Sequence, residues 1–180
     1  MTEAVAEGIQ VNRSTIRLSK EDITDIEIDA FVFYAQHDLA LGAGFGGAIS
    51  VRGGPAVQKE LDEMGPVATC DVVVSGAGKL KADHIIHAVG PRFQEPETED
   101  KLRTTMRNCL ARAEEKGIER LAFPAMGAGY YGIPATLSAS VMLEVLGQHL
   151  RGDTCIKEVV ICVLDTNQYE SFKAAIAALR

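Results

Sequence analysis

Two glycine-rich segments are the parts of this sequence best suited to chemistry. Residues 42–47 read Gly-Ala-Gly-Phe-Gly-Gly and residues 127–132 read Gly-Ala-Gly-Tyr-Tyr-Gly, each after a run of strand-forming residues. Glycines at such places let backbone N–H groups come close to an anion, with the start of a helix behind them. Together the two segments are suited to hold a diphosphate from both sides. The alternative for each is a tight turn between a strand and a helix.

The spacing of the first segment argues against two common nucleotide-binding motifs. It contains no G-x-x-x-x-G-K-[ST], so NTP hydrolysis of the Walker type is unsupported. The dinucleotide motif G-x-G-x-x-G is met only loosely, by Gly42, Gly44 and Gly47, and no acidic residue ends a following strand about 20 residues later.

The elements that must position these segments alternate along the chain. Apolar runs predict strands over residues 9–18 (a strand or hairpin at a sheet edge), 29–35, 70–74, 84–89, 120–124 and 156–164. Helices are expected over 46–52, 55–64, 99–116, 134–151 and 167–179, with Pro55 at a first helical position. Residues 75–78 are predicted to form a turn. This order predicts an α/β fold, a three-layer α/β/α sandwich with a mixed central sheet.

Composition and charge restrict the classes of function. The 180 residues, 47% hydrophobic and 24% charged, are typical of one globular domain. The 18 Lys and Arg against 25 Asp and Glu give a net charge of −7, which argues against duplex nucleic acid as a partner. No apolar run reaches the roughly 20 residues that span a bilayer, and residues 1–10 lack the features of a signal peptide. We therefore expect a soluble, cytoplasmic protein with no membrane partner.

Cysteines and histidines do not predict a metal site. The cysteines are widely spaced, without a C-x-x-C pair or a histidine at zinc-finger distance: Cys70, Cys109, Cys155 and Cys162. Reduced and mostly buried thiols are expected. His84 and His87 are an odd number of residues apart on a predicted strand, so they point to opposite faces and belong to the core or between layers. We expect no metal and no cofactor.

Five segments match, in order, the motifs of a known family. Residues 21–24 (Glu-Asp-Ile-Thr) resemble G-D-I-T, residues 29–36 resemble D-A-I-V-N-A-A-N, and residues 41–49 resemble a first glycine loop and its helix. Residues 84–91 resemble V-I-H-x-V-G-P, and residues 123–134 resemble F-P-A-[IL]-[SG]-[TA]-G-x-[YF]-G-x-P. From about Thr15 to the C-terminus the chain thus resembles the macro domain, the ADP-ribose-binding module.

The resemblance implies a single macro-like domain over residues 15–180, after a tail or edge strand over residues 1–14. It implies a cleft along the strand ends that holds ADP-ribose, free or on an ADP-ribosylated protein. In that cleft Asp22 accepts the adenine amine, although a helix N-cap or turn residue is the alternative. Tyr131 covers the distal ribose, although Tyr130 and Tyr131 alternatively pack in the wall. Leu164 stands where family members often place an aromatic ring.

The implied ligand-binding set follows the same motifs. Its members are Asp22, Ile23, Ala35, Gln36, Gly42, Ala43, Gly44, Phe45, Gly127, Ala128, Gly129, Tyr130, Tyr131, Leu164 and Asp165.

Three positions depart from the family pattern. Hydrolytic members commonly carry the second Asn of N-A-A-N, and one group adds an Asp after the first glycine loop. Here these positions hold Gln36 and Gly46, and the first Asn is replaced by Phe33. Gln36 keeps an amide that can hydrogen-bond a ribose hydroxyl, but a glycine cannot activate a water. The catalytic candidates are therefore Gln36 with its neighbours His37 and Asp38 as bases, the alternative being a solvated pair in a loop.

Three functions follow. The favoured one is a binding module for ADP-ribose, free or protein-linked, or for a related nucleotide diphosphate. The second is a hydrolase of ADP-ribosyl esters, such as O-acetyl-ADP-ribose, ADP-ribose 1″-phosphate or ADP-ribosylated protein, in which Gln36 and a substrate phosphate position the water. The third is a degenerate macro fold used for protein contact. Because neither glycine loop contains a basic residue, binding of one small anion should depend only weakly on salt.

Overall fold

The computed structural model describes residues 8–179, which form one β-sheet with helices on both faces. The strands are β1 (Gly8–Val11), β2 (Ser14–Ser19), β3 (Ala30–Tyr34), β4 (Val72–Gly76), β5 (His84–Ala88), β6 (Arg120–Phe123) and β7 (Glu158–Cys162). The helices are α1 (Gly44–Gly53), α2 (Pro55–Asp62), α3 (Thr98–Glu115), α4 (Ala135–Arg151) and α5 (Thr166–Leu179), with a short 3-10 turn η1 (Gly129–Tyr131).

The strand order places the two glycine-rich loops next to each other. Across the sheet the order is β1-β2-β7-β6-β3-β5-β4, with five parallel strands in the middle and antiparallel β1 and β4 at the edges. The carboxyl ends of the parallel strands therefore lie along one edge of the sheet, where ligands of open α/β sheets bind. Because β3 and β6 are neighbours, the loops that follow them emerge side by side.

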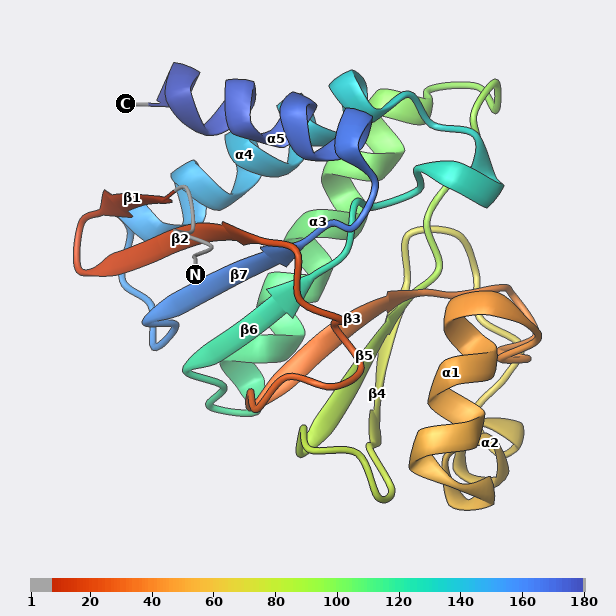
Figure 1. Cartoon of the computed structure of the whole chain (residues 1–180). Helices are drawn as coiled ribbons and strands as arrows, with labels where there is room; N and C mark the ends of the chain where they lie inside the picture. Colours follow the sequence, from red (N-terminus) through yellow and green to blue (C-terminus); the bar gives the residue numbers. More distant parts are fainter. Residues whose placement is uncertain (1–7, 180) are drawn as a thin grey trace.

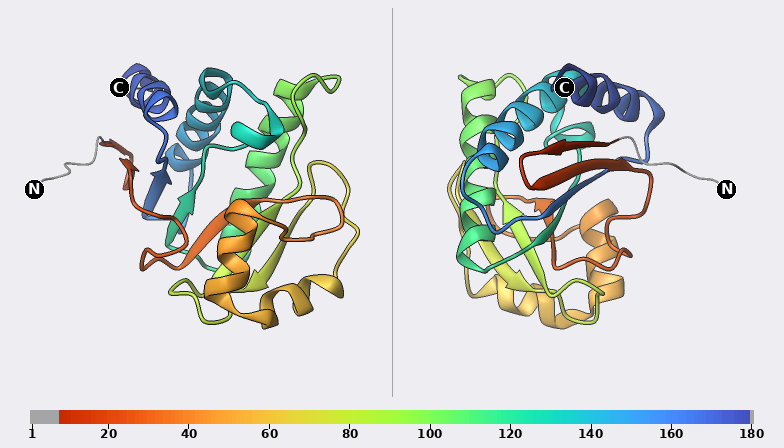
Figure 2. Two further views of the ribbon diagram at one scale, coloured as in Figure 1. Left: turned by 45° about the vertical axis from the view of Figure 1, so that its right-hand side comes forward. Right: turned by 90° about the vertical axis from the view of Figure 1, so that its left-hand side faces the viewer.

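Side chains of the central strands alternate between two hydrophobic cores. On β3, Val32 and Tyr34 join the core beneath α3, α4 and α5, whereas Phe31 and Phe33 join the core beneath α1 and α2. All five residues of β3 are buried, as expected for a continuous apolar strand that is covered on both faces. Figures 1 and 2 show α1 and α2 on one side of the sheet and the other helices opposite. The predicted three-layer sandwich with a mixed sheet is confirmed.

The N-terminal prediction is covered only in part. Residues 1–7 of the expected tail lie outside the described residues. Residues 8–11 form the edge strand β1, which pairs with β2 as an antiparallel hairpin. The predicted hairpin at a sheet edge is therefore present.

The turn predicted over residues 75–78 starts later than expected, at Gly78, and one strand also begins later than expected. Ser75 and Gly76 belong to β4 and pair with β5, rather than forming a turn. A Ser-Gly pair is typical of turns, but here the Ser75 hydroxyl is buried and lies 2.7 Å from Nε2 of His87, which holds the strand in place. Strand β4 begins at Val72 instead of residue 70 because Cys70 has a positive φ of 79°, outside the β region. The other elements lie within two residues of their expected bounds.

The described residues, 8–179, contain neither a disulfide bond nor a cluster of metal-ligating side chains. All four cysteines are free: Cys109 and Cys162 are buried, whereas Cys70 and Cys155 are half-buried. Over the same range no three His, Cys, Asp or Glu side chains lie close enough to hold a metal ion. No helix among these residues is both long and apolar enough to cross a bilayer.

Candidate functional site

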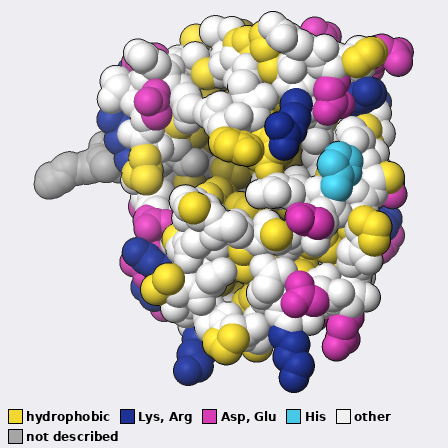
Figure 3. All heavy atoms as spheres, turned by 90° about the vertical axis from the view of Figure 1, so that its right-hand side faces the viewer, with side chains coloured by type: hydrophobic (Ala, Val, Ile, Leu, Met, Phe, Trp, Pro, Cys, Tyr) yellow, Lys and Arg dark blue, Asp and Glu magenta, His cyan; other side chains and the backbone are white. Residues whose placement is uncertain are grey.

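A cavity of about 510 Å³ lies between the two glycine-rich loops, at the carboxyl ends of β3 and β6. Figure 3 faces the α1 and η1 side of the molecule and shows a hollow with hydrophobic side chains in it. No residue that lines the cavity carries a charge. The lining residues are Phe33, Tyr34, Gln36, Leu41, Ala43, Gly44, Phe45, Gly46, Pro124, Ala125, Gly127, Ala128, Tyr130 and Tyr131.

The start of α1 forms one wall of this cavity. Gly42 and Gly44 have φ values of +66° and +61°, which glycine adopts without the penalty that a Cβ brings. Ala43 is the N-cap residue, and no side chain caps the helix. The first N–H groups of a helix have no partner within it, and they favour an anion. This wall therefore offers uncapped backbone N–H groups at the cavity.

The second glycine-rich loop forms the opposite wall through η1. Like α1, η1 has no side-chain cap. The loop is closed by a hydrogen bond of 3.0 Å from the N–H of Ile133 to the carbonyl of Gly127. Gly127 has a φ of +75°, and a Cβ there would lie 2.4 Å from Ile133 Cδ1 and 3.2 Å from the Tyr34 hydroxyl. Both its conformation and its packing thus require glycine.

Aromatic rings surround the space between the two walls. The rings of Tyr34 and Tyr131 lie 4.7 Å apart, and Tyr130 stands edge-on to Tyr131 at 5.2 Å. On the α1 side Phe33 and Phe45 form a T-shaped pair at 4.9 Å. Burial, with a smaller effect of the neighbouring Tyr131, raises the pKa of Tyr34 far above its ordinary value. Its phenol stays protonated and donates a hydrogen bond to the carbonyl of Pro91.

A smaller cavity of about 230 Å³ adjoins the first and shares Gln36 and Tyr131 with it. Unlike the larger cavity, it has acidic and basic side chains in its lining. Its lining residues are Ala35, Gln36, His37, Asp38, Val89, Gly90, Arg92, Glu95 and Tyr131. Gln36 is thus the catalytic candidate that reaches both cavities.

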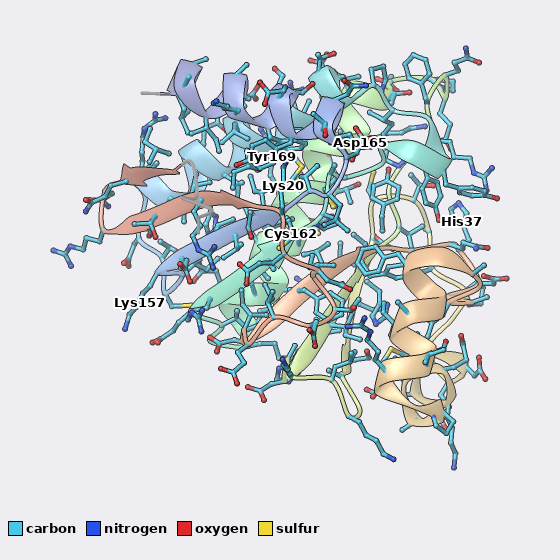
Figure 4. The ribbon with its side chains drawn as sticks, viewed as in Figure 1. Lys20, His37, Lys157, Cys162, Asp165 and Tyr169 are labelled. Atoms are coloured by element: carbon cyan, nitrogen blue, oxygen red, sulfur yellow. The ribbon has the colours of Figure 1, made fainter. Side chains whose placement is uncertain are left out.

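His37 and Asp38 line only the smaller cavity, and both ring nitrogens of His37 and one carboxylate oxygen of Asp38 have partners. Nδ1 of His37 lies 2.8 Å from the carbonyl of Val67, and Nε2 lies 3.5 Å from the hydroxyl of Thr69. Asp38 accepts a hydrogen bond of 2.9 Å from the N–H of Ala40. Both side chains are exposed, and Figure 4 shows His37 at the outer edge of the molecule. Their geometry resembles the solvated loop pair that the sequence left open as the alternative.

Gly46 does more than lack a carboxylate. A Cβ at this position would lie 1.6 Å from the carbonyl oxygen of Leu41, so the backbone leaves no room for any side chain. An aspartate, which the resemblance implies at this position for one hydrolytic group, therefore has no room here unless the loop changes.

The residues expected at the adenine end do not line either cavity. Asp22 accepts hydrogen bonds from the N–H (2.9 Å) and hydroxyl (2.7 Å) of Thr24, and its other oxygen lies 3.3 Å from Arg52. Burial opposes ionisation, but these Thr24 bonds and Arg52 together lower the pKa of Asp22. Asp22 therefore acts as a turn residue in this structure, which is one of the alternatives for it.

Of the other residues expected at the adenine end, Ile23 follows β2, whereas Leu164 and Asp165 follow β7. Leu164 is exposed (67%), and Asp165 accepts a hydrogen bond of 2.9 Å from the N–H of Gln168 at the start of α5. Ile23 is buried. Figure 4 shows Asp165 near Lys20 and Tyr169, well separated from His37. Gly42 and Gly129 shape the two loops but do not line the larger cavity.

Several lining residues were missed by the sequence prediction. Phe33 and Tyr34 end β3, and three further residues lie within three positions of a glycine-rich segment: Leu41, Pro124 and Ala125. Their place at the strand ends was the available signal. Arg92 had no such signal, because it follows a motif from another part of the chain. The structure brings it to within 5.9 Å of the Tyr130 ring centroid and 5.7 Å of the Tyr131 ring centroid.

Comparisons with known proteins agree with this geometry. A family model described as the macro domain matches residues 34–142. An uncharacterized protein of Saccharolobus solfataricus is 41% identical, covering 88% of this chain and 90% of its own. O-acetyl-ADP-ribose deacetylase 2 of Pantoea vagans is 31% identical, covering 87% of this chain and 95% of its own. The Oceanobacillus iheyensis macrodomain with ADP has a TM-score of 0.92 and 25% identity, covering 97% of this chain and 96% of its own.

Proposed function

The chain belongs to the macro domain family, and from this premise we propose that it binds ADP-ribose, free or attached to a protein. The observation that carries the proposal is the larger cavity, in which two glycine-rich loops more than 80 residues apart in the sequence line one uncharged space. One structure of a similar macrodomain contains ADP, and one structure of a mutant of it contains ADPR.

In this proposal the diphosphate is held by the backbone. The uncapped start of α1 and the loop around η1 supply N–H donors from opposite walls. Since no Lys or Arg lines the cavity, the negative charge is balanced by helix-end N–H groups rather than by a field of basic side chains. The distal ribose then lies toward Gln36 and Tyr131, where the two cavities meet.

The adenosine end is proposed to extend toward Asp22, Ile23, Leu164 and Asp165. Asp22 keeps one oxygen on Thr24, while the other faces Arg52 in an ion pair in which each side chain is 45% exposed. Such an exposed pair is worth little, so the exocyclic amine of adenine can replace it at small cost. Leu164 offers an apolar surface to the base without ring stacking.

Hydrolysis of an ADP-ribosyl ester is the second candidate. It is favoured by the relatives named O-acetyl-ADP-ribose deacetylases and by Gln36, which stands between the two cavities. Against it stand Gly46, which leaves no room for a carboxylate, and the existing hydrogen bonds of His37 and Asp38. We therefore give binding precedence over turnover.

The free cysteines are compatible with the cytoplasmic location proposed for the protein.

Isothermal titration with ADP-ribose tests the proposal. We expect saturable binding of one ligand per chain, and weaker binding of AMP, which lacks the second phosphate and the distal ribose. If no heat is released at millimolar ADP-ribose, the proposed function is contradicted. The remaining candidate is then a degenerate macro fold that is used for protein contact.

Incubation with O-acetyl-ADP-ribose separates the two candidates. A pure binding module leaves the ester intact at the rate of the buffer control. Release of acetate that is abolished in Gln36→Ala, with ADP-ribose binding retained, would establish the hydrolase instead.

A further inference from the structure

The smaller cavity is chemically different from the larger one that it adjoins. The larger cavity has no charged lining residue, whereas the smaller one is lined by His37, Asp38, Arg92 and Glu95. Gln36 and Tyr131 border both. A group attached to the distal ribose of a bound ADP-ribose would therefore enter a compartment with its own electrostatics.

The two carboxylates of this compartment already have partners. Glu95 lies 3.6 Å from Nζ of Lys101 and accepts a hydrogen bond of 3.2 Å from the N–H of Arg92. Asp38 accepts the N–H of Ala40. The charge of Glu95 is therefore balanced by Lys101, whereas Asp38 is held only by a backbone N–H and keeps its charge.

The guanidinium of Arg92 is different. Within residues 8–179 it has no hydrogen bond or ion pair with another side chain, and it lies over the rings of Tyr130 and Tyr131. Its backbone is held on both sides, because its N–H donates to Glu95 and the next N–H, of Phe93, donates to the carbonyl of Tyr131 at 3.0 Å. A positive charge with five donors is thus kept in the lining of the smaller cavity, on an exposed side chain that is available to a ligand.

We propose that the smaller cavity binds an anionic group carried on the distal ribose of ADP-ribose, and that Arg92 is the residue that selects it. The inference rests on the proposed function, since it takes ADP-ribose in the larger cavity as given. It adds that this chain distinguishes a negatively charged substituent from a neutral one of similar size. Arginine suits this task because its planar fork pairs with two oxygens of a phosphoryl or carboxylate group.

The test compares three ligands: ADP-ribose, ADP-ribose 1″-phosphate and O-acetyl-ADP-ribose. We expect the wild-type chain to favour the phosphorylated ligand over the acetylated one by about tenfold. Arg92→Gln should remove that preference, because the phosphorylated ligand loses its ion pair with the guanidinium and the neutral acetyl group has none to lose. Arg92→Lys should retain part of the preference. If a ligand is hydrolysed, the ratio of kcat/KM values replaces the ratio of affinities.

Arg13→Gln is the matched control, because Arg13 is an exposed arginine between β1 and β2, away from both cavities. It should leave all three affinities unchanged. Wild-type protein that binds ADP-ribose but shows no preference between the charged and neutral substituents overturns this inference alone. So does an Arg92→Gln variant that binds all three ligands more weakly by the same factor. Failure to bind ADP-ribose overturns the proposed function and the inference together.

Discussion

Gly46 and Leu41 approach each other so closely that residue 46 has no room for a side chain. A Cβ on residue 46 would lie 1.6 Å from the carbonyl oxygen of Leu41 and 2.5 Å from its carbonyl carbon. The neighbouring Gly47 is unlike it, since a Cβ there would meet only the Gly42 carbonyl oxygen at 3.4 Å. The two adjacent glycines therefore give a sharp test of how the first loop is built.

Gly46→Ala should destabilise the chain by about 3 kcal/mol or more, because a backbone carbonyl must move to relieve the overlap. The same movement should displace the start of α1 and weaken ADP-ribose binding by more than about tenfold. Gly47→Ala should keep wild-type binding and gain up to about 1 kcal/mol from helix propensity. Urea unfolding and calorimetric titration of both variants measure these effects. Equal stability and equal binding of the two variants would contradict the close approach of residue 46 to the Leu41 carbonyl.

Gly129 and Gly117 form a second matched pair, this time with equal backbone strain. Both have left-handed φ values, +78° and +67°, and open space where a Cβ would stand. Alanine at either position should cost about 1 kcal/mol of stability. Gly129→Ala should also weaken ADP-ribose binding several-fold, because relaxation of the loop shifts the N–H groups of η1. Gly117 follows α3 and lies at the opposite end of β6, so its variant should bind ADP-ribose normally. If both variants bind more weakly, the loss of stability alone explains the effect.

His87 makes stability depend on pH. It is fully buried, its Nδ1 has no partner among the described residues, and burial lowers its pKa to about 3. The unfolded chain therefore binds one more proton between about pH 6.5 and pH 3, so this contribution is complete above pH 6.5 and is lost as the pH falls. The expected slope is up to about 1.4 kcal/mol per pH unit.

His87→Leu should remove that slope while Ser75 keeps its hydrogen bond of 2.8 Å to the carbonyl of Gly76. Urea unfolding at pH 7.5 gives the packing cost of the substitution. The change in the free energy of unfolding between pH 6.5 and pH 4.5 gives the contribution of the extra proton. Parallel curves for the variant and wild type would show that His87 does not cause the loss.

Glu114 forms hydrogen bonds with the segment that precedes β7. It accepts hydrogen bonds from the Thr154 hydroxyl and from the N–H of Cys155 (3.0 Å), and it lies 2.7 Å from Nε2 of His149. Burial opposes ionisation, but these three partners lower the pKa of Glu114 to about 2. A carboxylate with a lowered pKa contributes stability above its unfolded value of about 4.5 and loses it as the pH falls toward 2.

Glu114→Gln should therefore destabilise the chain by about 2 kcal/mol at pH 7, and the difference should shrink near pH 3. Chemical unfolding at the two pH values checks this. A difference that does not change with pH would mean that the charge of Glu114 contributes nothing. ADP-ribose binding should be unchanged, because Glu114 lines neither cavity.

Local signals explain which parts of the molecule were predictable. The continuous apolar run of β3, Pro55 at the start of α2 and the glycine-rich segments each act over a few neighbouring residues, and the structure reproduces them. Arg92 was not predictable, because its place over Tyr130 and Tyr131 depends on where the segment after β5 meets the loop after β6. The close approach of Gly46 to Leu41 is likewise a property of the folded loop.

At the adenine end, residues that match the sequence motif do not line a cavity in the structure. Asp22 and Leu164 occupy their motif positions, yet neither lines a cavity, because Asp22 turns to Thr24 and Arg52 and Leu164 is exposed. Their role in binding stays a prediction that a liganded structure would test. The expectation of weak salt dependence applies to the larger cavity, whereas the proposed pairing of Arg92 with a charged substituent should be sensitive to salt.

The most direct test of the account is to follow backbone amide signals by NMR while ADP-ribose is added to labelled protein. We predict the largest shifts at the N–H groups of Gly44, Phe45 and Tyr130, in the two loops that line the larger cavity. A groove of about 560 Å³ between α4 and α5, lined by Leu143 and Ala175 among others, provides the contrast. Shifts confined to that groove, with the loop amides unmoved, would contradict binding of the diphosphate by the backbone of the glycine-rich loops.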